Sequence, residues 1–417
     1  MTYFITRVFL VATLLICNNV LAQAAWEFQA SGMLKASATV DDRIYIAGGK
    51  TVYALDFSGK PAWQRDLGAD IAARVTVAGA TLYVHSHKGV HALDKQGEPI
   101  WFFPKQDRGP LVAGKSWGWG DETLADPWGW YRSAPLVTNG RVYFGSDDGL
   151  YALSADSGAQ LWHTAMGPVT TDPVAFEDSL IVGSWDNRLY SLKLETGEIN
   201  WSLEAQTPRG PASQWIGYHG FNLNPVVYAD EVYAGARGTY FYKLNAKTGE
   251  EAWSVKVGTS WIGSPALVTD ETVYFGLSDG KAVLGYNRKG GEQNTFLKTG
   301  SLVFAQPQMY GDQLIIGTLS GRLLRADTKS GESEIVQTLT EETGSYNRYF
   351  DPKIQPAQMN RYQATQWSID KMLSEFNAIL NLAIHEDTVY LSTASGTLYA
   401  IPLDHGARPP ELSGHTP

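Results

Sequence analysis

Short runs of alternating apolar and polar residues, separated by glycine turns, fill most of this chain. The stretch from Ser133 to Trp162 shows the pattern clearly, with turns at Asn139-Gly140, Asp148-Gly149 and Ser157-Gly158. Such turns between apolar runs are typical of antiparallel hairpins. They predict four strands, called A to D, at about 134–138, 141–145, 149–153 and 160–165. Strands B and C are apolar on both faces, which predicts that they pack against neighbours on both sides.

The same four-strand unit recurs along the chain. The phrase Gly-x-x-x-Trp closes five units, with tryptophans 38, 61, 39 and 52 residues apart at Trp63, Trp101, Trp162, Trp201 and Trp253. A period near 40 residues with longer excursions is typical of a repeat fold that carries insertions. Weaker copies of strand B follow at 273–276, 314–317 and 389–392. The chain therefore contains eight units.

The two ends of the repeat region complete each other. The eighth unit stops without a strand D, whereas residues 25–30, which include Trp26 and Phe28, resemble a strand D without its unit. Pairing the two closes a ring and removes exposed sheet edges. We predict an all-β fold, an eight-bladed β-propeller of four-stranded antiparallel blades, with the last blade closed by the N-terminal strand. The repeat tryptophans are expected to fill the space between blades. Units six and seven lack this tryptophan and are expected to be less regular.

The first residues predict an exported protein. Arg7, a short apolar run and Ala22-x-Ala24 are typical of a secretory signal peptide, so residues 1–24 are expected to be removed. The mature chain would have 32 basic and 43 acidic side chains, without the basic surface of a nucleic-acid binder. It would also have no cysteine and no transmembrane span. We expect a monomer that is periplasmic or secreted. Lipidation at Cys17 is an alternative, although Ile16 stands where a lipobox has Gly, Ala or Ser.

The repeat resembles that of pyrroloquinoline-quinone (PQQ) propellers. The consensus Ala-Leu-Asp-x-x-(Thr/Ser)-Gly-x-x-x-Trp is recognisable at Leu153 to Trp162, Leu194 to Trp201 and Asn245 to Trp253. One branch of that family, the quinoprotein dehydrogenases, implies PQQ held between a Trp and a vicinal disulfide, with calcium. This chain has no Cys-Cys pair and no haem motif. The other branch contains non-catalytic propellers, such as the propeller subunit of the bacterial outer-membrane protein assembly (Bam) complex, and this chain resembles that branch more.

Three long insertions mark one face of the predicted propeller. They fall at 102–131, 202–221 and 336–380, each in a crossover from strand D to the next strand A, within a single domain spanning 25–405. The tail, 406–417, is expected to be disordered. Long loops on a rigid scaffold are where binding residues concentrate. A short helix is expected around 363–376.

The insertions are rich in aromatic residues, and two interpretations remain open. The side chains form either a small core that seals the loops onto the propeller or an aromatic binding surface. The binding-face candidates are Trp117, Trp119, Trp128, Trp130, Tyr131, Arg132, Trp215, Tyr218, His219, Asn222, Trp261, Gln306, Tyr346, Tyr349 and Trp367.

Residues before each strand A are expected to line the mouth of the central channel; they include Arg74, Arg132, Asn222, Asn224, Gln306 and Asn381. No convincing calcium site can be assembled, and the loop acids Asp121, Glu122 and Asp126 are expected to be solvated. His85 and His87 replace small residues of a B–C turn, but no third ligand completes a metal site.

These features favour a non-catalytic propeller of the cell envelope that recognises an envelope protein, or a glycan, through its aromatic loops. We predict no catalytic residues, no metal and no resident cofactor. The alternative is an enzyme that uses the same face. It would be a quinoprotein oxidoreductase with Trp261 and Arg132 at its cofactor, or a polysaccharide-active enzyme. His219, near Tyr218, could serve as the general base of a lyase-type enzyme.

Overall fold

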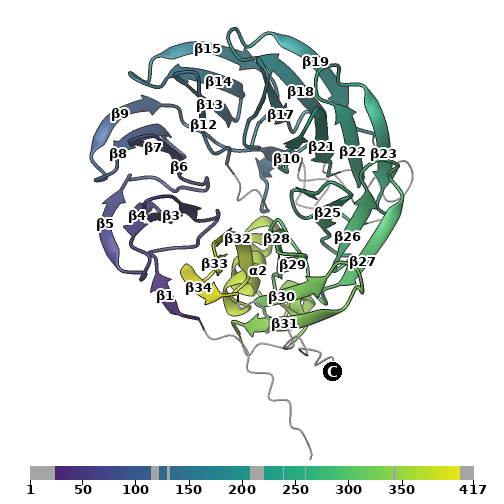
Figure 1. Ribbon diagram of the computed structural model, residues 1–417. Coiled ribbons are helices and arrows are strands. Elements are labelled where there is room, and N and C mark those ends of the chain that lie inside the picture. The colour runs from purple at the N-terminus through teal and green to yellow at the C-terminus, as the bar shows by residue number, and fades with distance from the viewer. Residues whose placement is uncertain are drawn as a thin grey trace, which may run out of the picture.

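Eight four-stranded antiparallel sheets stand around a central axis and form a closed ring (Figure 1). The computed structural model describes residues 24–113, 122–128, 132–206, 220–237, 239–258, 260–340 and 344–403. The predicted all-β, eight-bladed propeller is confirmed. Among the described residues, none of the helices has the length and apolar character that crossing a membrane requires.

Blades 1 to 4 each contain four strands that are consecutive along the chain. They are β2 (Thr39–Val40), β3 (Ile44–Gly48), β4 (Thr51–Leu55) and β5 (Pro61–Asp66); β6 (Thr76–Ala78), β7 (Thr81–Ser86), β8 (Gly89–Asp94) and β9 (Pro99–Pro104); β12 (Leu136–Thr138), β13 (Arg141–Ser146), β14 (Gly149–Ser154) and β15 (Gln160–Ala165); β16 (Val174–Phe176), β17 (Ser179–Gly183), β18 (Arg188–Lys193) and β19 (Ile199–Glu204).

Blades 5 to 7 repeat this order, and blade 8 takes its outermost strand from the N-terminal part of the chain. The strands are β20 (Val226–Tyr228), β21 (Glu231–Gly235), β22 (Tyr240–Asn245) and β23 (Glu251–Lys256); β24 (Leu267–Val268), β25 (Thr272–Gly276), β26 (Ala282–Asn287) and β27 (Gln293–Lys298); β28 (Gln308–Tyr310), β29 (Gln313–Gly317), β30 (Arg322–Asp327) and β31 (Ser333–Thr338); β32 (Ile379–His385), β33 (Thr388–Thr393), β34 (Thr397–Pro402) and β1 (Trp26–Gln29).

Strand β1 closes the ring as the pattern predicts. It pairs antiparallel with β34, with Trp26 opposite Ala400 and Gln29 opposite Thr397. The ring therefore joins residues from the two ends of the described chain in one sheet, and no blade is left with three strands. This closure removes the free edges that an open repeat array would expose.

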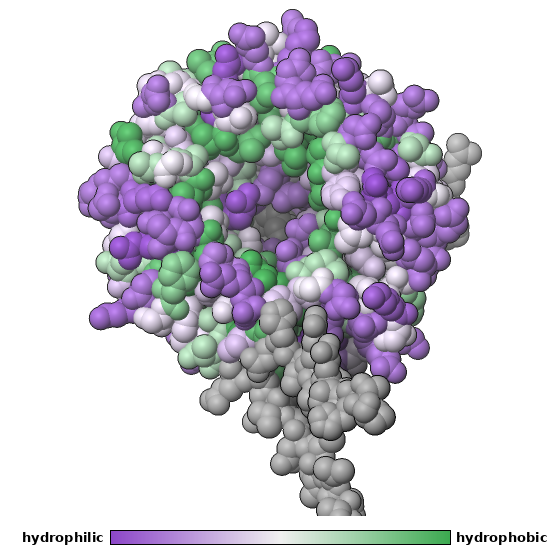
Figure 2. Space-filling model, in the orientation of Figure 1, coloured by the Kyte–Doolittle hydropathy of each residue, from purple (hydrophilic) through white to green (hydrophobic). Residues whose placement is uncertain are grey.

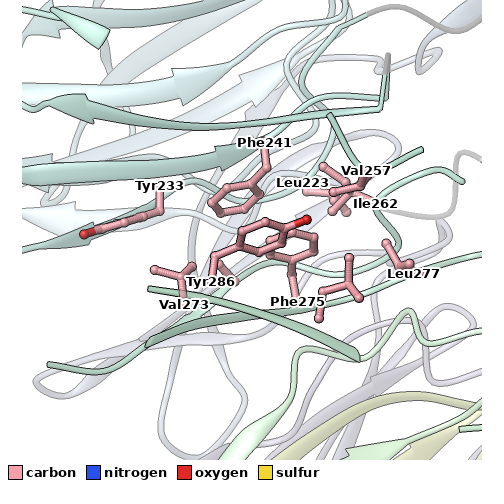
Figure 3. Close-up of a cluster of buried hydrophobic side chains, with 11 residues drawn as sticks. Leu223, Tyr233, Phe241, Val257, Ile262, Val273, Phe275, Leu277 and Tyr286 are labelled. Atoms are coloured by element: carbon pink, nitrogen blue, oxygen red, sulfur yellow. The ribbon is translucent and has the colours of Figure 1, made fainter. Parts of the chain in front are cut away.

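The core lies between blades, because strands B and C are buried on both faces whereas strands D alternate between partly buried and exposed residues. Figure 3 shows the layer between blades 5 and 6. There Phe241 stacks on Phe275 with ring centroids 4.4 Å apart, and Phe275 lies nearly parallel to Tyr286 at 5.6 Å. Stacked aromatic pairs of this kind add to the free energy gained by burying apolar area.

Each repeat tryptophan contacts the next blade and donates a hydrogen bond to it. In blade 2, the indole Nε1 of Trp101 donates a hydrogen bond to the carbonyl of Ala155 in blade 3 (2.8 Å). The ring also lies against Gly158, where a Cβ would stand 2.6 Å from Trp101 Cε3 and φ is +70°. Gly158 is thus required for two reasons: its backbone has a positive φ that favours glycine, and a side chain at this position would clash with the Trp101 ring. Trp26 makes the same contact with Gly59 across the ring closure.

The two blades without a tryptophan differ from each other. Blade 6 pairs Gly285 with Thr295 and keeps the β-bulge where the tryptophan-bearing blades have it, so the expectation of irregularity is wrong there. Blade 7 shifts its bulge to lie between Leu323 and Leu324, earlier in the strand, and is less regular as expected. In blade 6, Thr295 opposite Gly285 keeps the strand pairing of the other blades. In blade 7, Ile335 stands at the tryptophan position but pairs with Leu324, one residue earlier in strand C than the partner in the other blades.

Candidate functional site

The insertions follow three of the D strands and lead to the next A strand. They occupy 105–135 between β9 and β12, 205–225 between β19 and β20, and 339–378 between β31 and β32. The first contains a hairpin of β10 (Leu111–Ala113) and β11 (Thr123–Ala125). The third contains the 3-10 helix η2 (Tyr346–Phe350) and the helix α2 (Arg361–Glu375). In Figure 1, α2 and β10 are both drawn inside the ring of blades. We call the face of the propeller formed by these crossovers the insertion face.

Helix α2 is held on the propeller by one apolar side. Asn360 caps its N-terminus in a capping box with Gln363, which satisfies backbone donors of the first turn. Ile369, Met372 and Leu373 are buried with Leu302 and Leu319 of the propeller. The helix is therefore a fixed part of the insertion face, at almost the place that the sequence predicts.

Three aromatic candidates belong to the third insertion and have different environments. Tyr349 is buried, and its hydroxyl donates to Glu375 Oε2 at 2.6 Å, so it is a core residue and not part of a surface. Tyr346 is half-buried, with the Lys281 ammonium 4.9 Å from its ring centre. Trp367 is half-buried on α2, with the Lys371 ammonium 5.7 Å from its ring centre. In the third insertion, Tyr349 is therefore part of a small core that seals the loop onto the propeller, whereas Tyr346 and Trp367 each keep one side accessible to solvent.

The first insertion reaches the opposite side of the ring through a buried ion pair. Asp126 Oδ2 lies 2.8 Å from Arg237 Nη1 of blade 5, and both side chains are almost fully buried. The guanidinium lies 4.7 Å from the ring centre of Trp185 and 5.1 Å from that of Trp261. The expectation that Asp126 is solvated is wrong, because its carboxylate is buried against Arg237, whose guanidinium lies against two indole rings. Glu122, by contrast, is exposed as expected.

A second contact joins the first insertion to the third. The hydroxyl of Tyr362 on α2 donates to the carbonyl of Ala125 at the end of β11 (3.0 Å). Trp128, three residues further along, lies edge-on to Phe304 and packs against the cluster that holds α2. Two insertions that are about 200 residues apart in sequence therefore form one connected structure across the ring.

The first insertion is anchored at its base by buried charges. Arg132 Nε lies 2.9 Å from Asp107 Oδ2, and the same carboxylate oxygen lies 3.9 Å from His85 Nε2. His85 belongs to β7 and not to the turn, and its Nδ1 lies 2.9 Å from the carbonyl of Ser133. Burial lowers the pKa of His85 and favours the neutral ring. Among the described residues, His, Cys, Asp and Glu form no group of three placed to hold a metal ion.

The buried imidazoles predict an acid-sensitive fold. Burial lowers the pKa of His91 to about 4, and its ring packs on Phe102 at 4.5 Å. An unfolded chain binds this proton near pH 6.5, so acid favours the unfolded chain. The contribution is complete above about pH 6.5 and falls as the pH drops toward 4. The wild-type protein loses free energy of unfolding between pH 7.5 and pH 4.5. In the His91→Phe variant this loss should be smaller by about 2 kcal/mol, as measured by urea unfolding at the two pH values. An unchanged difference between the two pH values would refute this assignment.

The residues before the A strands meet around a cavity on the ring axis. This cavity has a volume of about 420 Å³ and is lined by Arg132, Asn222 and Gln306 among the candidates. Asn222 and Trp261 also line a much smaller adjoining cavity of about 30 Å³. Lys35 and Asp172 line the main cavity as well and were not among the predicted channel residues. Both residues precede an A strand, β2 or β16, which is the same criterion that selected Arg74, so the sequence contained the signal for them.

Seven candidates lie outside the described residues and stay predictions: Trp117, Trp119, Trp130, Tyr131, Trp215, Tyr218 and His219. The same holds for the signal peptide, apart from Ala24, and for the tail 406–417.

PQQ and calcium, the cofactors of the quinoprotein branch, do not fit the described residues. A stacking platform at Trp261 would have to displace the guanidinium of Arg237, which lies against that ring. Arg132, the second residue expected at such a cofactor, is engaged by Asp107 in a buried pair.

Fold, repeat and insertions together define a class: an eight-bladed PQQ-like propeller with a built-up insertion face. The chain belongs to the family described as outer membrane protein assembly factor BamB, whose profile matches residues 19–116, 87–218 and 147–409.

Individual relatives are distant. The chain is 23% identical over 251 residues to the outer membrane protein assembly factor BamB of Shewanella oneidensis, an alignment that covers 48% of this chain and 62% of that protein. To BamB of Yersinia pestis it is 24% identical over 211 residues, which cover 48% of this chain and 51% of the relative. These alignments thus span between half and two thirds of the relatives' own lengths. The crystal structure of BamB from Moraxella catarrhalis superposes with a TM-score of 0.65 at 17% identity, covering 92% of this chain and 100% of that one. At that identity the likeness establishes the fold alone.

Proposed function

We propose that this protein is a non-catalytic scaffold for outer-membrane protein assembly in the bacterial cell envelope. The observation that carries the proposal is the match of the assembly-factor family across residues 19 to 409, together with an insertion face whose described part is held by buried contacts. The protein would act in the periplasm, either free after removal of residues 1–24 or, as the alternative, cleaved before Cys17 and lipidated at that residue. Intact-mass measurement of the exported protein distinguishes these two forms.

The partner would be another envelope protein that docks on the insertion face. Leu111 on β10 and Met359 before α2 leave 54% and 37% of their surface exposed. The two belong to one connected surface, because Leu111 pairs with Ala125, whose carbonyl accepts from Tyr362 on α2. Exposed apolar residues on a scaffold fixed by buried contacts suit protein recognition. A glycan would need fully exposed aromatic platforms, whereas among the described residues the rings of Trp367 and Tyr346 are each only partly exposed.

A charge placed on this surface should prevent docking without unfolding the protein. We expect the double variant Leu111→Asp/Met359→Asp to recover at least about tenfold less of the outer-membrane assembly complex from envelope extracts than wild type does. In a strain that lacks the native protein, the double variant should also fail to restore the amounts of outer-membrane β-barrel proteins.

Leu161→Asp is the matched control. Leu161 is 48% exposed but lies on β15, the outer strand of blade 3, away from the insertions. This variant should bind and complement as wild type does, and melting curves should show that all three proteins fold. Equal recovery of the complex by the double variant, or an equal loss with Leu161→Asp, would exclude the insertion face as the docking site.

A further inference from the structure

The cavity on the ring axis has a polar band and an apolar band. Figure 2 shows the ring hollowed at its centre, with hydrophilic residues near the opening. The polar band consists of residues that precede the A strands, among them Lys35, Arg74 and Asn222. The apolar band lies on the A strands themselves, with Leu136 and Val174 at the first positions of β12 and β16. A cavity of about 420 Å³ with this division suits a small molecule that has one polar end and one apolar end.

Lys35 supplies a positive charge that the rest of the site does not neutralise. In the described part of the chain, its ammonium makes no ion pair and no hydrogen bond; only its backbone carbonyl is engaged, by Asn381 Nδ2 at 2.9 Å. The nearest acids, Asp70 and Asp370, act on it from beyond contact distance and are exposed to solvent. Burial lowers the pKa of Lys35, which expresses the cost of holding this charge without a partner.

The other charges of the cavity are already balanced. Arg132 is paired with Asp107 at 2.9 Å, and Arg74 faces Asp172 at 3.6 Å. Asp172 also accepts a hydrogen bond from the backbone N–H of Ala134 at 2.7 Å. Lys35 therefore leaves the polar band with one net positive charge. The buried Asn222 Oδ1 has no hydrogen-bond partner in the described structure; because it is an acceptor, it suits a donor group of a ligand and not the acid group.

We infer that the central cavity is a binding site for a small organic carboxylate. Its carboxylate would accept hydrogen bonds from the Lys35 ammonium, and its uncharged body would lie against the apolar band. A monocarboxylate matches the single unbalanced charge, whereas a neutral molecule would leave the ammonium desolvated and unpaired. The site is separate from the proposed docking surface, because Leu111 and Met359 do not line the cavity.

The inference has a test that needs no ligand. A lysine kept for binding is unfavourable in the empty protein, so Lys35→Met should raise the melting temperature of the ligand-free chain. Lys60→Met, at an exposed lysine in the C–D turn of blade 1, should leave it unchanged. A lower melting temperature for Lys35→Met would assign Lys35 a structural role and overturn the inference.

The second test uses matched acids and amides. Phenylacetate and 4-methylpentanoate are titrated calorimetrically into wild type, beside phenylacetamide and 4-methylpentanamide. We expect saturable binding of at least one acid, at least about tenfold weaker binding of its amide, and loss of acid binding in Lys35→Met but not in Lys60→Met. The inference is overturned if neither acid saturates, if acid and amide bind alike, or if Lys35→Met binds as wild type does. None of these results bears on recovery of the assembly complex, so the two proposals fail separately.

Discussion

Asp126→Ala is expected to destabilise the protein by about 3 kcal/mol, because it leaves the guanidinium of Arg237 buried without its carboxylate partner. The arginine cannot move to water easily, since Trp185 and Trp261 lie on it at 4.7 and 5.1 Å. Asp126 Oδ1 also accepts from the backbone N–H of Trp128, so the chain after β11 loses a turn contact as well. Urea unfolding followed by tryptophan fluorescence measures the difference.

The matched control is Glu122→Ala, which removes an exposed carboxylate from the same insertion and should cost less than about 0.5 kcal/mol. A double variant, Asp126→Leu/Arg237→Met, tests the cause. Replacing both charges by apolar side chains of similar volume should recover much of the loss, because no buried charge then remains unpaired. If the double variant is as unstable as Asp126→Ala, packing and not electrostatics accounts for the effect. If Asp126→Ala unfolds as wild type does, the ion pair does not hold the insertion.

The propeller could be predicted from the sequence because its information is local and repeated. Each blade restates the same strands and turns, so a weak signal in one unit is supported by seven others, and Trp26 identified even the closing strand. The same logic misjudged blade 6. Loss of the tryptophan suggested irregularity, but Thr295 opposite Gly285 fits the common register. Register depends on the pairing across strands, which a comparison of single positions does not contain.

The insertion face could be located from the sequence but not described. Nothing local pairs Asp126 with Arg237, which are 111 residues apart, or Tyr362 with Ala125, which are 237 apart. These contacts depend on how far each insertion reaches across the ring. The usual expectation for an acidic loop residue, solvation, therefore failed at Asp126. Lys35 was missed for another reason: it precedes a two-residue strand, β2, whose sequence signal is weak.

The contact between tryptophan and glycine makes a second strong prediction, for Gly158→Ala. At φ +70° an alanine costs roughly 1 kcal/mol in backbone strain, and here its Cβ would also stand 2.6 Å from the Trp101 ring. Moving that ring disturbs the packing between blades 2 and 3 and its 2.8 Å hydrogen bond to Ala155. We expect Gly158→Ala to lower the free energy of unfolding by about 3 kcal/mol in total, as measured by urea unfolding.

Gly140→Ala separates the two causes within the same blade. Gly140 has φ +71°, almost the same backbone strain, but no atom lies within 4 Å of where its Cβ would stand. The Gly140→Ala variant should therefore lose only about 1 kcal/mol of unfolding free energy. The difference of about 2 kcal/mol between the two variants measures the contact between blades. Equal losses in the two variants would mean that the glycine is required for the turn alone. The tryptophan would then be a filler of the space between blades, and the Gly-x-x-x-Trp spacing would reflect turn geometry and not the joining of one blade to the next.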